Sequence, residues 1–229
     1  INGAASNVGV MVVDNNGTIL NSGTAGSIAT SEGSAIANIG AFVVNNNGTI
    51  SSSFSMADID VLAEAGADVQ NVSGFAATSS GTIDGVYTRS AMSFTNEPQP
   101  ATTIASLVGN LTNGNADAVT NSYAAGLLGY YNETQDSILF GTVPEGHTKL
   151  SSVYVDKSLA GEKSANSYKY SASLSSMMDM KYMNSSMNYV PVEKCNDVFK
   201  YLYERKDLEN YYRIEHLYFP IPYFVHIPH

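Results

Sequence analysis

The sequence predicts an all-β protein whose first two thirds form a β-solenoid, and three observations carry this prediction. A twelve-residue segment recurs along the chain, with spacings of 31 to 36 residues between copies. Its apolar runs are short, β-branched and bounded by Asn-Gly or Ser-Gly pairs, a pattern typical of strands and turns. Only 14% of the 229 residues are charged, so Ser, Thr, Asn and Gly must supply the polar surface. We expect a parallel β-helix of about five coils, with a right-handed coil favoured, followed by a small α+β cap.

The repeat is clearest near the amino terminus. The run Ile39–Ile50 (IGAFVVNNNGTI) matches Val8–Ile19 (VGVMVVDNNGTI) at an offset of 31, and the weaker copy Ser73–Ile83 follows 33 residues later. Two more degenerate copies extend the series. The apolar anchors that end the copies are Ile19, Ile50, Ile83, Val119 and Leu150. The aromatics four residues after the last four anchors are Phe54, Tyr87, Tyr123 and Tyr154, and the glycines ten residues before an anchor are Gly9, Gly40 and Gly109.

In a solenoid, equivalent residues of successive turns stack about 4.8 Å apart. We therefore expect an inward aliphatic stack at the anchors, a neighbouring aromatic stack, insertions confined to loops, and corners of positive φ at the Asn-Gly pairs. The alternation of Val10 and Val12 with Met11 and Val13 leaves the inward set open. The alternative fold is a sandwich in which two β-hairpins share similar turns, but it does not explain why the aromatic position persists.

The pattern resembles the GLUG repeat of filamentous-hemagglutinin-like adhesins and bacterial immunoglobulin A peptidases. The residues that carry the resemblance are 39–54, with Gly48-Thr49-Ile50 as the most typical element, and 107–126. It covers about two thirds of the chain, although the fourth and fifth copies lack the Gly-Thr pair and Phe140 replaces a leading glycine. The resemblance implies a secreted β-helical stalk or adhesin module whose repeat is architectural and holds no active site.

The composition divides the chain in two. All 19 glycines precede residue 162, whereas residues 162–229 hold 10 of the 15 tyrosines and 5 of the 8 methionines. We place the domain boundary at residue 161, with a solenoid over 1–161 and a Tyr/Met-rich segment over 162–229. From Pro191 onward, apolar residues at helical spacing predict one amphipathic helix that buries Cys195. This segment either caps the end of the solenoid or forms an interaction surface.

The net charge narrows the classes of binding partner that we expect. The net charge is −10 and the pI is near 4.6, and such a field disfavours nucleic acid and anionic membranes. No apolar run is long enough for a transmembrane span, so we expect no membrane insertion. The chain starts at Ile1 without a signal peptide, and we expect a mature segment or a piece of a longer protein. We expect it to be secreted or at the cell surface, where its partners are other domains of the same polypeptide, a host or cell-surface protein, or a glycan.

One carboxylate pair invites a catalytic interpretation. In a strand, Asp58 and Asp60 share a face at a separation of about 6.8 Å, which suits calcium or acid/base chemistry in a carbohydrate-active β-helix. A lyase also needs bases to bind acidic sugars, and Arg89 is the only Lys or Arg among the first 148 residues. We favour a solvated acidic loop over residues 58–68.

The sequence offers few other candidates for catalytic, metal-binding or modified residues. No histidine pair has the spacing of a zinc peptidase, and packing explains the methionine tract better than copper does. These residues are His147, His216, His226, His229, Met177, Met178, Met180, Met183 and Met187. The sequons Asn16, Asn47, Asn71, Asn110, Asn132 and Asn184 are close to the number expected by chance, and the first two suit turns.

The sequence therefore predicts no catalytic, cofactor-binding or metal-binding residue and no cofactor. We expect a non-catalytic structural or adhesive module. The alternatives are a carbohydrate-active enzyme that uses Asp58 and Asp60, or an accessory domain of a secreted peptidase.

Overall fold

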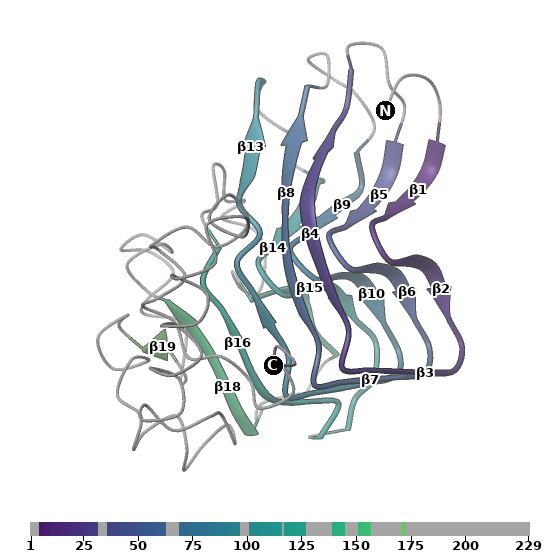
Figure 1. Ribbon diagram of the computed structural model, residues 1–229, viewed down its shortest axis with the longest axis vertical. Coiled ribbons are helices and arrows are strands. Elements are labelled where there is room, and N and C mark those ends of the chain that lie inside the picture. Colours follow the sequence, from purple (N-terminus) through teal and green to yellow (C-terminus); the bar gives the residue numbers. More distant parts are fainter. Residues whose placement is uncertain are drawn as a thin grey trace, which may run out of the picture.

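The computed structural model describes residues 5–31, 36–62, 69–96, 101–115, 117–126, 139–144, 151–156 and 171–172. These residues form nineteen strands and no helix, and every strand pairing among them is parallel. Successive turns of the chain lie side by side as a β-solenoid (Figure 1). The fold prediction is confirmed, and the hairpin alternative is excluded because hairpins pair antiparallel.

The strands build three sheets. Sheet A contains β1 (Ala5–Gly9), β5 (Ile36–Gly40), β9 (Asn71–Ser73) and β14 (Thr103–Ala105). Sheet B contains β2 (Val12–Asn15), β6 (Val43–Asn46), β10 (Ala76–Ser79), β15 (Val108–Leu111) and β17 (Phe140–Thr142). Sheet C contains β3 (Thr18–Leu20), β4 (Gly23–Ala29), β7 (Thr49–Ser51), β8 (Phe54–Val61), β11 (Thr82–Asp84), β12 (Tyr87–Thr88), β13 (Met92–Phe94), β16 (Val119–Ala124), β18 (Ser151–Asp156) and β19 (Ser171–Ala172).

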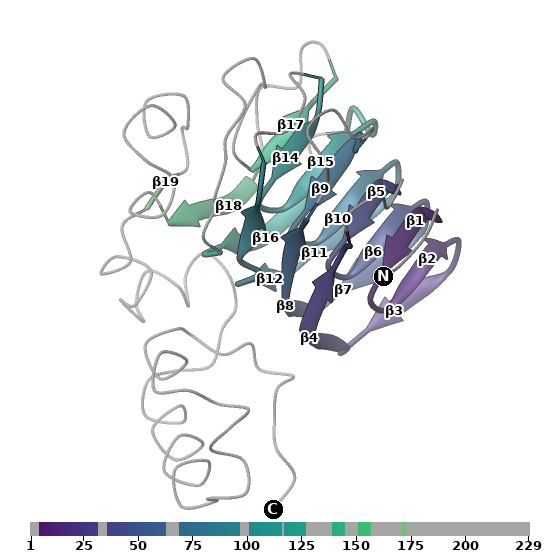
Figure 2. The ribbon, with the colours of Figure 1, turned by 90° about the horizontal axis from the view of Figure 1, so that it is seen from above.

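The structure describes about three complete turns, where the sequence predicted about five coils. The first three turns run through sheets A and B and the full length of sheet C. The fourth turn contributes β14 to β16, which end at Ala124, and the fifth contributes β17 and β18. Figure 2 shows the turns in order, beginning with the first coil, residues 5–31. The predicted helix and most of the predicted 162–229 segment lie outside the described residues, so the cap stays a prediction.

The predicted aliphatic stack is confirmed from Ile19 to Val119, and its fifth member, Leu150, lies outside the described residues. Ile19 pairs with Ile50, Ile50 with Ile83, and Ile83 with Val119, each in parallel register. The last three of these side chains are fully buried in one hydrophobic core. The column follows from the sequence repeat, because parallel strands in register place equivalent positions of successive turns side by side.

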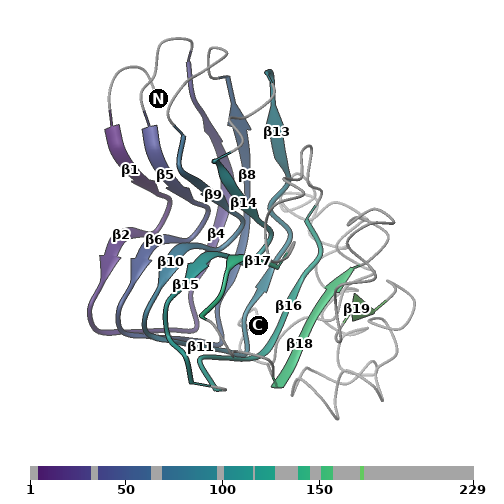
Figure 3. The same ribbon diagram turned by 180° about the vertical axis from the view of Figure 1, so that it is seen from behind.

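Figure 3 shows the bend of the backbone between sheets A and B. A second interior column of side chains, which was not predicted from the sequence, lies at this bend. The Phe42 and Phe75 rings stack there with centroids 4.6 Å apart. The backbone N–H groups of Phe42 and Val43 both donate to the Phe75 carbonyl, at 3.0 Å each. Two amides on one carbonyl disturb the ladder as a bulge does and bend the strand, so two consecutive residues face the core. Phe42 and Val43 both lie in that core, and Val12, the first-coil equivalent of Val43, packs against it.

The prediction of positive φ at the Asn-Gly pairs is wrong. Apart from Gly26 (116°), positive φ among the described residues falls two residues after each of the first four anchors, at Asn21 (50°), Ser52 (48°), Gly85 (62°) and Asn121 (48°). These residues form one column where the chain turns within sheet C. Only one of the four is glycine, although Asn tolerates this region better than most residues do.

The Asn-Gly glycines serve close packing. A Cβ on Gly48 would lie 2.0 Å from the carbonyl oxygen of Gly17, and a Cβ on Gly81 would lie 1.9 Å from that of Gly48. No side chain fits between these backbones. The corner glycines therefore permit the turns to approach, a role distinct from supplying a left-handed conformation.

The insertions lie outside the paired strands, as predicted, but one shifts an expected equivalence. Val108 pairs with Ala76, 32 residues earlier, whereas Val119 pairs with Ile83, 36 residues earlier. The fourth turn thus carries four extra residues between β15 and β16. Gly109 is consequently not the equivalent of Gly9 and Gly40, which pair with each other; in the fourth turn Ala105 holds that place.

A buried polar ladder fixes the corner after sheet B. Asn15 Nδ2 donates to Asn46 Oδ1 at 2.8 Å, and Asn46 Nδ2 donates to Ser79 Oγ at 3.1 Å. Asn46 and Ser79 are fully buried, and Asn15 nearly so. Each of these buried side chains therefore has a hydrogen-bond partner in a neighbouring turn, as buried polar groups require.

Asn46→Ala is expected to lower the free energy of unfolding by about 2 kcal/mol, because it leaves Asn15 Nδ2 with only its long bond to the Thr49 carbonyl, at 3.4 Å, and opens a small void. Chemical denaturation measures this change. The adjacent Asn47→Ala is the matched control. Asn47 makes a similar ladder with Asn16 at 3.1 Å and Ser80 at 2.9 Å, but it is exposed, and its loss should cost about 0.5 kcal/mol or less. Equal effects of the two changes would contradict the role of burial.

Candidate functional site

The carboxylate pair lies in a strand, so the prediction of an acidic loop over 58–68 is wrong for its first residues. Asp58 and Asp60 project from β8, and both are engaged with the third turn. Asp58 Oδ1 accepts from the backbone N–H of Ala91 at 2.9 Å, and Asp60 Oδ1 accepts from the Ser93 hydroxyl. The pair shares one face, as predicted, but its oxygens hold neighbouring turns together.

The predicted aromatic stack is confirmed for Phe54, Tyr87 and Tyr123 and lies on the outer side of sheet C. Phe54 pairs with Tyr87, Tyr87 with Tyr123, and Tyr123 with Tyr154. The residue after each of the first two aromatics faces the interior. Ser55 Oγ donates to the Ala41 carbonyl, and Thr88 Oγ1 donates to the Gly74 carbonyl. Side chains alternate along a strand, so the rings face outward.

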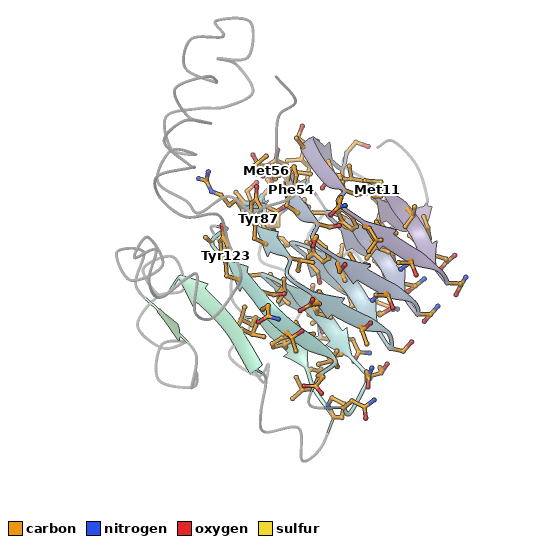
Figure 4. The ribbon with its side chains drawn as sticks, turned by 60° about the horizontal axis from the view of Figure 1, so that its bottom comes forward. Met11, Phe54, Met56, Tyr87 and Tyr123 are labelled. Carbon is orange, nitrogen blue, oxygen red and sulfur yellow. The ribbon has the colours of Figure 1, made fainter. Side chains whose placement is uncertain are left out.

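The ring faces are covered by one another. Ring centroids are 5.3 Å apart for Phe54 and Tyr87 and 5.4 Å apart for Tyr87 and Tyr123, with planes within 10° (Figure 4). The free face of Phe54 lies over Gly23, whose Cβ, if it had one, would be 2.1 Å from Phe54 Cζ. An aromatic ring commonly covers an edge glycine in this way. Sugar rings stack on open aromatic faces, and this row presents none along its described length.

Tyr123 sits at the buried end of the row. Burial raises the pKa of Tyr123 well above 10, proximity to Tyr87 raises it further, and Arg89 opposes the shift. The phenol is therefore neutral at physiological pH. Arg89, the single Lys or Arg of the first 148 residues, is therefore near enough to the row to act on the charge of Tyr123.

Polar ladders run along the outer surfaces of sheets A and B. On sheet A, Asn71 donates to Asn38 at 2.6 Å and Asn38 to Asn7 at 2.8 Å. On sheet B, Asn45 donates to Asp14 at 2.7 Å and Thr78 to Asn45 at 2.9 Å. The surface polar groups are therefore largely paired with the next turn. Four sequon asparagines, Asn16, Asn47, Asn71 and Asn110, belong to such ladders.

Several candidate residues cannot be placed. The four histidines, the methionine tract, Cys195, Asn132 and Asn184 lie outside the described residues. Within the described ranges, no three His, Cys, Asp or Glu side chains gather as metal ligands. Nor does this part of the chain contain a helix with the length and hydropathy of a membrane span.

One surface feature was missed from sequence: a group of exposed hydrophobic side chains on the first coil. Val10, Met11, Val13 and Leu20 are exposed there, and they are four of the five large exposed hydrophobic residues among those described. The available signal was composition, since residues 5–31 contain no Lys, Arg or Pro and a single acid, Asp14.

Comparison with protein-family models, with curated proteins and with solved structures finds no match to this chain.

Proposed function

We propose that this chain is a non-catalytic structural and adhesive module of a secreted or cell-surface protein. One observation carries the proposal. In the described solenoid, side chains that could form a site are stacked on, or hydrogen-bonded to, residues of a neighbouring turn. Its one carboxylate pair, its aromatic row and its outer asparagines all contact the next turn. Such an arrangement suits a rigid spacer whose outer faces meet other surfaces.

Composition supports the same proposal. A surface made of Ser, Thr, Asn and Gly, with 14% charged residues, keeps its polarity without depending on ion pairs. The GLUG-like pattern is a further argument for a secreted stalk or adhesin, and it remains a resemblance. Other domains of a longer polypeptide, a host or cell-surface protein and a glycan are the partners that this role would involve.

The experiment compares the wild-type chain with the double variant Asp58→Asn and Asp60→Asn. Each amide keeps an oxygen that can accept the hydrogen bonds from Ala91 and Ser93, so the melting temperature should change by about 2 °C or less. Both proteins, coated on beads, should adhere equally to immobilised glycans and to cell surfaces. Neither should release reducing ends or unsaturated sugars from acidic or neutral polysaccharides.

The control is Phe75→Ala, assayed at a temperature between the melting temperatures of the variant and the wild type, where the variant should lose adhesion together with the fold. Polysaccharide turnover that the wild type shows and the double variant lacks would overturn the proposal in favour of the carbohydrate-active alternative. Adhesion that survives unfolding would show that it does not depend on the solenoid.

A further inference from the structure

The outward-facing aromatic row of sheet C is more deeply buried than stacking alone explains. Phe54 is half-buried, Tyr87 is 6% exposed and Tyr123 is 0% exposed. Side chains stand roughly perpendicular to a sheet, so a stacked outward tyrosine has its ring faces covered while its phenol points away from the sheet. The outer edge of Tyr123 is therefore covered by something besides the stack.

The outward residues near Tyr123 do not supply this cover. Asn121 is engaged elsewhere, because its Nδ2 donates to Asp84 Oδ1 at 2.8 Å. Ala125 has a single methyl group, and that group is itself only 5% exposed. Arg89, in the preceding turn, is half-buried as well. A further layer of chain therefore lies over this end of the row.

The last described strands bring the chain to the same place. Tyr154 of β18 pairs with Tyr123, and β19 pairs with β18, so Ser171–Ala172 lies two strands beyond β16 in sheet C. Adjacent strands are about 4.8 Å apart, so residue 173 begins within roughly 15 Å of Tyr123. The 57 residues from 173 to 229 can reach the row without a long connection.

Residues 173–229 have a composition that suits packing on aromatic rings. They contain 8 of the 15 tyrosines, 5 of the 8 methionines and 3 of the 8 phenylalanines of the chain. Methionine fills irregular gaps and makes favourable contacts with rings, and tyrosine adds apolar area together with a hydroxyl. The matching surface consists of Phe54, Met56, Tyr87 and Tyr123, which lie along one side of the solenoid (Figure 4).

The charges of the two parts are also compatible. Residues 1–148 carry 12 acids and one base, which gives a net charge of −11. Three of these acids, Asp58, Asp60 and Asp84, lie on the outer face of sheet C. Residues 173–229 carry seven acids and six bases, a net charge of −1. The segment therefore brings the bases that the solenoid lacks and adds little repulsion.

We propose that residues 173–229 pack on the outer face of sheet C, over the row from Phe54 to Tyr123, as a second layer on one side of the solenoid. The segment then covers a side of the solenoid, not its end, and its aromatic side chains are used within the chain. This inference is independent of the proposed adhesive function, since the cover over Tyr123 does not depend on what the solenoid binds.

Photo-crosslinking of the full chain tests the contact. One variant carries p-benzoyl-phenylalanine in place of Phe54 and another carries it in place of Met56, because both side chains are outward and half-buried. Irradiation should link each probe to residues 173–229 of the same molecule, which mass spectrometry of the digested monomer identifies. The matched control carries the probe at Thr78, which is half-buried on the outer face of sheet B, and should give no link to this segment.

Limited proteolysis provides a second measurement. The wild-type chain should resist cleavage within residues 173–229, because a packed segment must detach before it is cut. Met56→Asp places a carboxylate beneath the segment and should raise the rate of this cleavage at least about tenfold. Thr78→Asp adds the same charge to sheet B and should change the rate by less than about twofold.

Three results would overturn the proposal. Links from the probes at positions 54 and 56 to residues 127–138 or to a second molecule would assign the cover to another segment or to a partner. Links from neither position would place residues 173–229 elsewhere, such as at the end of the solenoid. Rapid cleavage within 173–229 of the wild-type chain would show that the segment has no stable packing, and this measurement does not depend on whether a variant folds.

Discussion

Replacing Phe75 by alanine is expected to destabilise the solenoid by about 3–5 kcal/mol, a large part of the stability of a typical domain. Phe75 is fully buried, and its ring stacks on Phe42 at 4.6 Å. Truncation leaves a cavity that cannot close, because the backbones on both sides are held by parallel ladders in sheets A and B. Guanidinium denaturation followed by circular dichroism measures the loss.

Phe75→Leu is the matched control. Leu107 occupies the equivalent position one turn later and Leu139 the next, and both are buried in the same core. Leucine is therefore compatible with the column, and we expect a loss of about 1 kcal/mol. If leucine and alanine destabilised equally, the interior column would not be what holds the turns together.

The second large effect is expected at Gly48. Gly48→Ala places a Cβ 2.0 Å from the Gly17 carbonyl oxygen and 2.9 Å from the Gly17 nitrogen, and both are backbone atoms. The turns must separate, which weakens the bonds from Asn47 N–H to Asn15 O and from Thr49 N–H to Gly17 O, each 2.8 Å. We expect a cost of about 3 kcal/mol, measured by thermal and chemical unfolding.

Gly17→Ala provides the control from the same column. No atom lies within 4 Å of a Cβ at Gly17, because it is on the open face of the first coil, and neither glycine has positive φ. The change should be neutral or stabilise by up to about 1 kcal/mol, since alanine lowers the entropy of the unfolded chain. A similar penalty at both positions would show that conformation, and not contact between turns, requires glycine here.

Sequence reasoning placed the candidate site residues only in part. It put Asp58 and Asp60 on one face and the aromatics in one row, because alternation along a strand and register between turns follow from spacing alone. It could not show that Ala91 and Ser93 donate hydrogen bonds to these carboxylates, or that the rings cover one another, since these contacts depend on side-chain rotamers. The exposed hydrophobic side chains of the first coil were not predicted, because exposure is set by what lies next to a turn.

The amino-acid sequence by itself determined the solenoid, the register of the Ile19 and Phe54 columns and the place of the insertions in loops. A repeated period is sufficient for these, because parallel turns stack equivalent residues at one spacing. Only the tertiary structure decided three other features: the inward pair Phe42 and Val43, the left-handed column at Asn21, Ser52, Gly85 and Asn121, and the packing role of Gly48. Each arises where the chain changes direction, and there the side-chain alternation of a straight strand no longer tells which way a residue points.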